Sequence, residues 1–324
     1  DDAGYDKTAF EKMLEIKGDS DHTKLIDMLT DLNDYSIGIE DVLKEHFDEE
    51  NIVYWMAFQI LMGNVDTQNR NVYLYSPLNS DIWYFIAWDN DGCLMRPEYE
   101  LRNFSDQNSW EKGISNYWGN VLFQRCLKSR SFREKLNDAI LDLREYLNKD
   151  MLTSKIESYK NVLKPYLYLM PDAEYEPLTS EQYDQIAASL PDEIEKNYQL
   201  YLESLETPMP FYIGVPTIDG DKLKFNWDVS YDLDAEDITY SVEVAGDYLF
   251  RDVIYQNTTL TVPEAEMDLP KAGQYFVRVR ATNTSGKTQD AFDYYVTDEG
   301  KYYGMRCFYI TEDSTVEEDD YEEG

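Results

Sequence analysis

Four side chains with oxygen atoms suited to metal binding gather in two short polar stretches of the sequence. Asp66 and Asn71 lie in the first stretch, and Asp89 and Asp91 lie in the second. Proteins bind Mg²⁺ through one or two carboxylates, and substrate phosphate and water fill the remaining positions. Phosphoryl transfer also needs a carboxylate that orients the attacking hydroxyl. Brought together, these four residues would suit metal-dependent chemistry of a phosphate group.

Three apolar elements have to bring the two stretches together. Residues 50–62 are apolar nearly all round, which indicates a buried helix too short to cross a membrane, and Gly63 is the expected stop. Two strands are predicted next, at 71–75 and 82–88, joined by a turn at 76–81. The ends of a hairpin lie side by side, so the polar stretch before the first strand should face the one after the second.

Other roles for these residues stay open. Asp and Asn also cap helices and shape turns, and Asp91 could be a turn residue or a partner of a metal ligand. A calcium loop that begins at Asp89 would have Glu100 at position twelve, but its glycine, Gly92, falls at position four, whereas an EF-hand needs glycine at position six. A structural domain stabilised by Ca²⁺ therefore remains an alternative.

The net charge of the chain limits the classes of molecule that it is expected to bind. The 324 residues include 29 Lys and Arg against 65 Asp and Glu, a formal net charge of −36. Such a field repels phosphate backbones and anionic lipid, so we expect no nucleic-acid partner and no membrane insertion. It favours cations and basic polypeptides, although it could serve only solubility. The 3 cysteines are far apart and the 2 histidines have no metal-ligating neighbour, which argues against zinc sites, disulfide frameworks and Ser-His-Asp hydrolases.

The chain divides by periodicity into an α+β, multidomain arrangement. Residues 1–206 indicate mainly helices, whose tyrosines at helical spacing we expect in the core: Tyr166, Tyr168 and Tyr198. A Pro-rich linker follows, and residues 207–298 then predict an all-β sandwich. Its expected strands are 222–229, 238–245, 258–262, 274–282 and 288–296. Residues 299–324 indicate a strand-like segment and an acidic, solvated tail.

The motif N-x-D-x-x-x-x-N-x-Y-L-Y at Asn64–Tyr75, followed by an apolar strand and W-D-x-D within Trp83–Gly92, resembles the CotH family of spore-coat kinases. That family is similar to atypical, secreted protein kinases, in whose fold a catalytic Asp precedes a metal-binding Asn by five positions. The resemblance spans roughly residues 20–205. It implies a mostly helical kinase-like C-lobe with a small catalytic hairpin.

The same resemblance implies roles for the four polar residues. Asp66 would be the catalytic Asp, Asn71 and Asp89 would hold the metal and its nucleotide, and Asp91 would be a further metal-ligand candidate. The implied cofactor is Mg²⁺ or Mn²⁺, with ATP as co-substrate. The implied acceptor is a protein, and the acidity of this chain would suit a basic one. The implied location is secreted or at the cell surface, on the bacterial exterior.

The sequence departs from a complete kinase at its beginning. A kinase N-lobe should precede residue 20, with a Lys on a strand and a glycine-rich loop over the phosphates. The chain contains no G-x-G-x-x-G sequence for such a loop. The lysines available there, Lys7, Lys12 and Lys17, lie in a helix-like stretch and not on a strand. Because the chain begins at Asp1 without Met, we expect the N-lobe upstream and this piece alone to be inactive or nearly so. The alternative is a catalytically inactive extracellular binding or scaffold protein.

The predicted sandwich resembles a fibronectin type III module. Trp227 fits the early core Trp of that module, and Tyr275 fits the Tyr of its tyrosine corner. Such a module could bind a ligand or act as a spacer that holds the enzyme away from a neighbouring domain, and fold alone does not decide between them.

Overall fold

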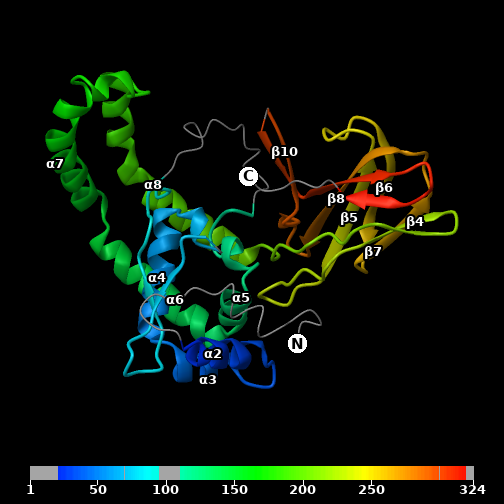
Figure 1. Ribbon diagram of the computed structural model, residues 1–324, viewed down its shortest axis with the longest axis horizontal. Coiled ribbons are helices and arrows are strands. Elements are labelled where there is room, and N and C mark those ends of the chain that lie inside the picture. The colour runs from blue at the N-terminus through cyan, green and yellow to red at the C-terminus, as the bar shows by residue number, and fades with distance from the viewer. Residues whose placement is uncertain (1–20, 69, 95–109, 299, 319–324) are drawn as a thin grey trace.

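A computed structural model describes residues 21–68, 70–94, 110–298 and 300–318. Helices fill the N-terminal part and antiparallel sheets the C-terminal part (Figure 1), so the expected α+β multidomain fold class is confirmed. The described α-helices are α2 (Thr23–Asn33), α3 (Ile39–His46), α4 (Glu49–Met62), α5 (Val121–Lys128), α6 (Arg130–Tyr146), α7 (Lys149–Leu167) and α8 (Ser180–Glu206). None of these helices is long and apolar enough to cross a membrane.

Helix α4 occupies the centre of the helical part because its side chains are apolar nearly all round. It packs against α6 and also against α8. The Asp48 carboxylate caps its start by accepting a hydrogen bond of 2.9 Å from the Asn51 N–H. Gly63 ends it with a φ of 62°, where a Cβ atom would lie 2.6 Å from the Asn197 amide. The predicted buried helix and its stop are both confirmed.

A two-stranded hairpin is fixed to the start of α4. Strands β1 (Tyr73–Tyr75) and β2 (Tyr84–Ile86) pair antiparallel, and both are shorter than predicted. The Asn51 amide donates to the Phe85 carbonyl at 3.1 Å, and the Phe85 N–H donates to the Asn51 side-chain oxygen at 2.7 Å. The Phe85 ring packs against Trp55 with 4.7 Å between centroids. Helix and hairpin therefore form one unit.

Two sheets enclose the core of the C-terminal part, in which Trp227 is buried as expected. One sheet has the order β13-β12-β8-β5-β6, with β9 also paired to β8, and the other has the order β3-β4-β7. Their bounds are β3 Thr217–Asp219, β4 Lys222–Asn226, β5 Ile238–Ala245, β6 Val253–Leu260, β7 Glu264–Asp268, β8 Gly273–Asn283, β9 Thr288–Asp290, β12 Met305–Ile310 and β13 Val316–Glu318. A separate hairpin consists of β10 (Tyr294–Thr297) and β11 (Gly300–Tyr303).

The strands differ from expectation at several points. The segment predicted as one strand at 288–296 forms two, because β9 pairs with β8 whereas β10 belongs to the separate hairpin, and the strand predicted at 222–229 ends at Asn226. The strand predicted at 258–262 has the wrong bounds, because β6 ends at Leu260 and β7 begins at Glu264. Pro263 lies between them, and proline cannot donate a ladder hydrogen bond. The sheet also continues past residue 298, since β12 pairs with β8 and β13 forms within the segment expected to be a tail.

The helical and β parts share one hydrophobic core. The Trp110 indole N–H donates to the Phe292 carbonyl at 3.0 Å, and its ring packs on Phe292 and Tyr303 with centroids 5.1 and 6.1 Å apart. Phe292 and Tyr303 belong to the same buried cluster as the α4 side chains. The Lys301 ammonium, on β11, lies 2.5 Å from the Glu111 carboxylate. The β part is therefore docked on the helices.

Replacing Trp110 should test this shared core. We expect Trp110→Ala to lower the free energy of unfolding by about 3–5 kcal/mol, the usual loss for a buried aromatic ring. Urea titrations followed by circular dichroism would measure it. The matched control is Trp88→Ala, because Trp88 is 57% exposed and its loss should change stability by less than about 1 kcal/mol. Equal effects of the two changes would contradict a shared core.

Candidate functional site

Asp66 lies in a tight turn directly after α4. The turn, η1 (Val65–Thr67), follows Gly63 and the buried Asn64. The Thr67 hydroxyl donates to the Asn64 carbonyl at 3.0 Å and is itself fully buried. Asp66 is exposed between these anchored neighbours. The end of the buried helix thus presents one carboxylate on a short, tethered loop.

Residues from about fifty positions further along the chain hold this loop in place. The Asn116 amide, in η4 (Ser115–Tyr117), donates to the Val65 carbonyl at 3.1 Å. The Tyr117 and Thr67 hydroxyls share a buried hydrogen bond of 2.9 Å. The Asn120 amide donates to the Gln68 carbonyl at 3.3 Å. Sequence reasoning missed these residues, although asparagines beside the buried Tyr117 and Trp118 were an available signal.

The second polar stretch is attached to the same end of α4. The Asn64 amide donates to the Asn90 side-chain oxygen at 3.3 Å, and the Leu94 N–H donates to the Met62 carbonyl at 2.7 Å. Asn71 and Asp89 both adopt the left-handed backbone region, with φ of 53° and 49°. Asn and Asp enter that region more readily than other non-glycine residues. Both stretches therefore converge on the C-terminal end of α4.

Three of the four predicted residues are brought together. The pKa of Asp89 is raised by a hydrogen bond with Asp91 and by the charge of that carboxylate, then by burial and by the charge of Asp66. All of these influences act in the same direction. Asp91 therefore lies within hydrogen-bonding reach of Asp89 and Asp66 lies near enough to affect its charge, while the roles of all three as ligand or base stay predictions.

The position of Asn71 relative to the three aspartates follows only from the pairing of the hairpin. It precedes β1, and the pairing of Tyr73 with Ile86 puts it at the hairpin end that Asp89 follows. Within the described ranges, no hydrogen bond joins its side chain to any of the three aspartates. Its expected part in metal binding also stays a prediction.

The expected metal site is not formed by a cluster of protein ligands in the part of the chain that the structure describes. Among the residues that the structure describes, no three or more His, Cys, Asp or Glu side chains are arranged to hold a metal ion. Ca²⁺ takes six to eight oxygen ligands, whereas Mg²⁺ needs one or two carboxylates and completes its shell with phosphate and water. A bound cation would relieve the influence of Asp91, through its hydrogen bond and its charge, and of Asp66 that raises the pKa of Asp89. Which cation these carboxylates hold stays a prediction.

The neighbouring thiol is not a nucleophile at neutral pH. Burial and the charge of Asp91 raise the pKa of Cys93 to about 11. Because the thiolate is the reactive form, Cys93 stays protonated and unreactive under ordinary conditions. The chemistry of this end of α4 belongs to its carboxylates.

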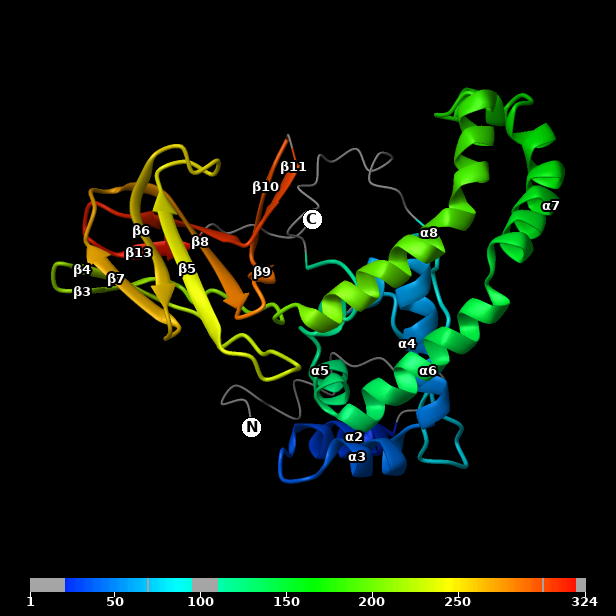
Figure 2. The ribbon, with the colours of Figure 1, turned by 180° about the vertical axis from the view of Figure 1, so that it is seen from behind.

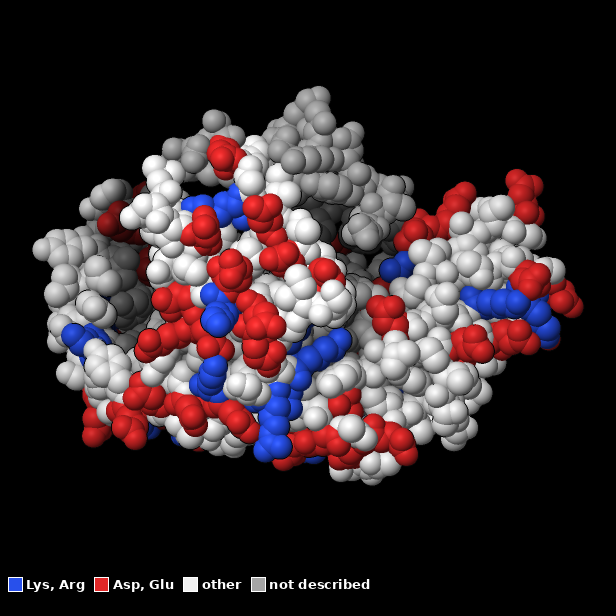
Figure 3. All heavy atoms as spheres, turned by 90° about the horizontal axis from the view of Figure 1, so that it is seen from below, with Lys and Arg blue, Asp and Glu red and all other residues white. Residues whose placement is uncertain are grey.

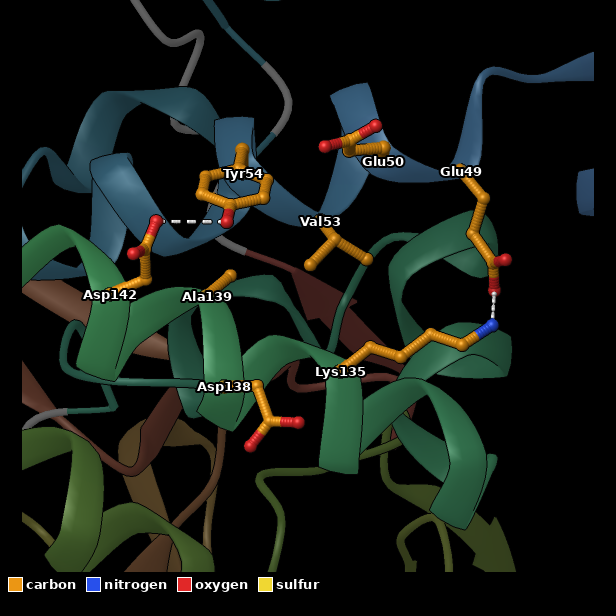
Figure 4. A pocket seen from close by; sticks show the side chains of 8 residues that line it. All are labelled: Glu49, Glu50, Val53, Tyr54, Lys135, Asp138, Ala139 and Asp142. Carbon is orange, nitrogen blue, oxygen red and sulfur yellow. Dashed lines mark hydrogen bonds and ion pairs between the residues drawn. The ribbon is translucent and has the colours of Figure 1, made fainter.

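A surface groove of about 430 Å³ lies between α6 and the N-terminal half of α4 (Figure 4), whereas Asp66 follows the C-terminal end of α4. Lys135 bridges it to Glu49 at 2.6 Å, and the Tyr54 hydroxyl donates to Asp142 at 2.9 Å. The remaining lining residues are Glu50, Val53, Asp138 and Ala139. Two of its four carboxylates thus have partners already, and none of the predicted site residues lines it.

The crowding of carboxylates should appear in the pH dependence of stability. Because the pKa of Asp89 is raised in the folded state, the folded protein binds that proton more tightly than the unfolded chain. This contribution is complete below the ordinary Asp pKa of about 3.9 and is lost as pH rises through the raised value. Without added metal, we therefore expect Asp89→Asn to gain stability relative to the natural protein as pH rises to neutrality.

Urea midpoints measured across this pH range would check the expectation. The matched control is Asp81→Asn, an exposed aspartate on the turn of the same hairpin, which should leave the pH profile unchanged. If the pH dependence of the urea midpoint changed equally in both variants, or did not change in Asp89→Asn, the proposed effect of Asp91 and Asp66 on Asp89 would be contradicted.

Comparisons with known proteins bear on the helical part. The model of the family described as CotH kinase protein matches residues 1–201. A comparison with curated proteins found no significant match. Among solved structures, domains 1–6 of the surface layer protein SbsC align with 89% of this chain at 12% identity. This chain spans 33% of that protein's length, and the TM-score of 0.18 is too low to support any argument.

Proposed function

The chain belongs to the CotH kinase family, and on that premise we propose that it serves an atypical protein kinase, one that transfers the γ-phosphoryl group of ATP to protein hydroxyls. The observation that carries the proposal is the gathering of Asp66, Asp89 and Asp91 at one end of a buried helix. A carboxylate whose pKa is raised by neighbouring carboxylates, as that of Asp89 is, is typical of sites that bind a cation or move a proton.

Each residue has a distinct proposed role. Asp66 orients the acceptor hydroxyl and accepts its proton. Asp89 and Asn71 hold the metal, and Asp91 is a further ligand or orients Asp89 through their hydrogen bond. Bound Mg²⁺ or Mn²⁺ would neutralise charge on the phosphates of ATP.

The anchoring of the Asp66 loop supports this assignment. Asn116 and Asn120 hold the backbone carbonyls of Val65 and Gln68, on either side of Asp66. A base that acts by orientation gains from such fixation, because small displacements of a reacting group lower rates strongly. A surface aspartate whose role was only solubility would not need these contacts.

The charge distribution bears on the proposed acceptor. The segment 311–324 holds eight acids and no base, so without it the net charge is still −36 + 8 = −28. Figure 3 shows acidic side chains spread over the face seen from below, with fewer basic ones between them. We therefore propose a basic protein acceptor and a location on the bacterial exterior.

The C-terminal part is proposed to be a fibronectin type III-like module. The Tyr275 hydroxyl donates to the Lys271 carbonyl at 2.9 Å, as in a tyrosine corner. Trp227 stands in the core with its ring 5.5 Å from that of Tyr240. Since the module is docked on the helices through Trp110, its proposed role is to support the kinase-like lobe.

Two substitutions separate binding from transfer. We expect Asp66→Asn to keep Mg²⁺-dependent ATP binding but to slow phosphate transfer by roughly 10²–10⁴, as for the loss of a general base. Asp89→Asn should lose the Mg²⁺-dependent binding itself. Radiolabelled ATP measures transfer to a basic protein acceptor, and the thermal midpoint measures binding. The assays use this chain and, where its gene encodes more sequence upstream, a longer version.

Asp81→Asn is the control and should behave as the natural protein in both assays. Transfer at the natural rate by Asp66→Asn would overturn the assignment of the base. A second candidate, an inactive extracellular scaffold, is favoured by the lack of a G-x-G-x-x-G sequence in this chain. It would be accepted if neither version bound Mg²⁺–ATP, and a midpoint raised by Ca²⁺ alone would indicate a calcium-stabilised domain.

A further inference from the structure

Helix α7 exposes a continuous row of large apolar side chains. Six of them, on the helix and directly after it, are between 52% and 67% exposed, and we call them the α7 stripe: Tyr159, Val162, Leu163, Tyr166, Leu169 and Met170. The expectation that Tyr166 lies in the core is therefore wrong. The first four follow the helical spacing i, i+3, i+4, i+7, so they occupy one face of α7.

The charged side chains of the same segment lie on the side of α8. Lys164 pairs with Asp184 of α8 at 2.6 Å, and Lys160 lies 2.6 Å from Glu157 and 3.8 Å from Asp184. A helix on the surface of a monomer normally has the opposite arrangement, with apolar residues inward and charges outward. An exposed apolar row of this length is typical of a surface that another molecule covers.

The charge of this segment indicates which kind of molecule covers the α7 stripe. Residues 158–171 contain two Lys and no Asp or Glu, in a chain with 65 acidic residues. A basic partner would be drawn to the acidic surfaces elsewhere on the chain. A second copy can meet this acid-free stretch without bringing carboxylates of the two stretches together, and its two Lys lie beside Asp184 of α8. Figures 1 and 2 show that α7 projects from the body, which keeps the two acidic bodies apart.

We propose that two copies of this chain associate through their α7 stripes, packed antiparallel about a twofold axis. Aromatic side chains bury roughly 150–250 Å² each, and the stripe combines two tyrosines with four smaller aliphatic side chains, all more than half exposed, so it offers on the order of 600 Å² per copy. A specific interface buries about 1,200–2,000 Å² in total, so two such stripes reach the lower end of that range, and a polar rim would add to it. This proposal is independent of catalysis.

Sedimentation velocity over a wide range of protein concentration tests the proposal. The natural protein should convert from monomer to dimer as concentration rises. The double variant Val162→Asp/Tyr166→Asp places like charges against each other at a twofold interface, and we expect it to weaken dimerisation at least about a hundredfold. Both side chains are exposed, so the thermal midpoint should not change at concentrations where the natural protein is also monomeric. The control is Tyr146→Asp, a tyrosine of α6 that is 66% exposed and lies outside the stripe.

Cross-linking gives a second readout. Val162→Cys lies near the middle of the stripe, so a short bismaleimide should join two copies of that variant and leave the natural protein monomeric on a denaturing gel. A protein that stays monomeric at every concentration overturns the proposal. So does a dimer that Tyr146→Asp disrupts as strongly as the stripe variant. Binding of a monomeric protein to neutral lipid vesicles, lost in the stripe variant, would assign the stripe to a membrane instead.

Discussion

Burial of α4 on every side positions the polar loops at its end. After its acidic first turn, α4 is apolar nearly all round and leaves little surface for water, so α6, α8 and the hairpin pack around it. Asn51 then joins the hairpin to the first turn, and Gly63 ends the helix where both polar stretches begin. The position of Asp66 relative to Asp89 follows from these contacts.

The three aspartates illustrate how a site can oppose the stability of its own fold. Gathering carboxylates raises the pKa of Asp89, which is unfavourable for the folded protein at neutral pH unless a cation or proton is present. The nearby buried contacts, such as the Tyr117–Thr67 hydrogen bond, provide rigidity that offsets this repulsion. A buried polar layer beneath an exposed acidic loop is a common way to hold like charges in place.

The sequence was sufficient where local patterns decide the structure. The apolar residues of α4, the turn chemistry after β1 and the spacing of Asp66 and Asp89 were readable because each depends on neighbours in the chain. Contacts between residues that are far apart in the sequence could not be predicted. Nothing local links Asn116 to Val65, or Trp110 to Phe292, and the pairing of β12 with β8 depends on a connection that first leaves the sheet. The exposure of Tyr166 was missed because a helical period cannot tell an inward face from one that another molecule covers.

The docking of Phe292 and Tyr303 onto the helical core also affects how such proteins can recombine. Domain boundaries usually fall in exposed linkers, and the segment after α8 is where such a division would be made. Trp110 packs on Phe292, and Trp118 packs on Tyr231. Separating the two parts at this linker would expose both tryptophans on the helical part and both partner rings on the β part to solvent. The two parts are therefore expected to be inherited together, and a different sandwich could replace this one only if it brought matching aromatic residues.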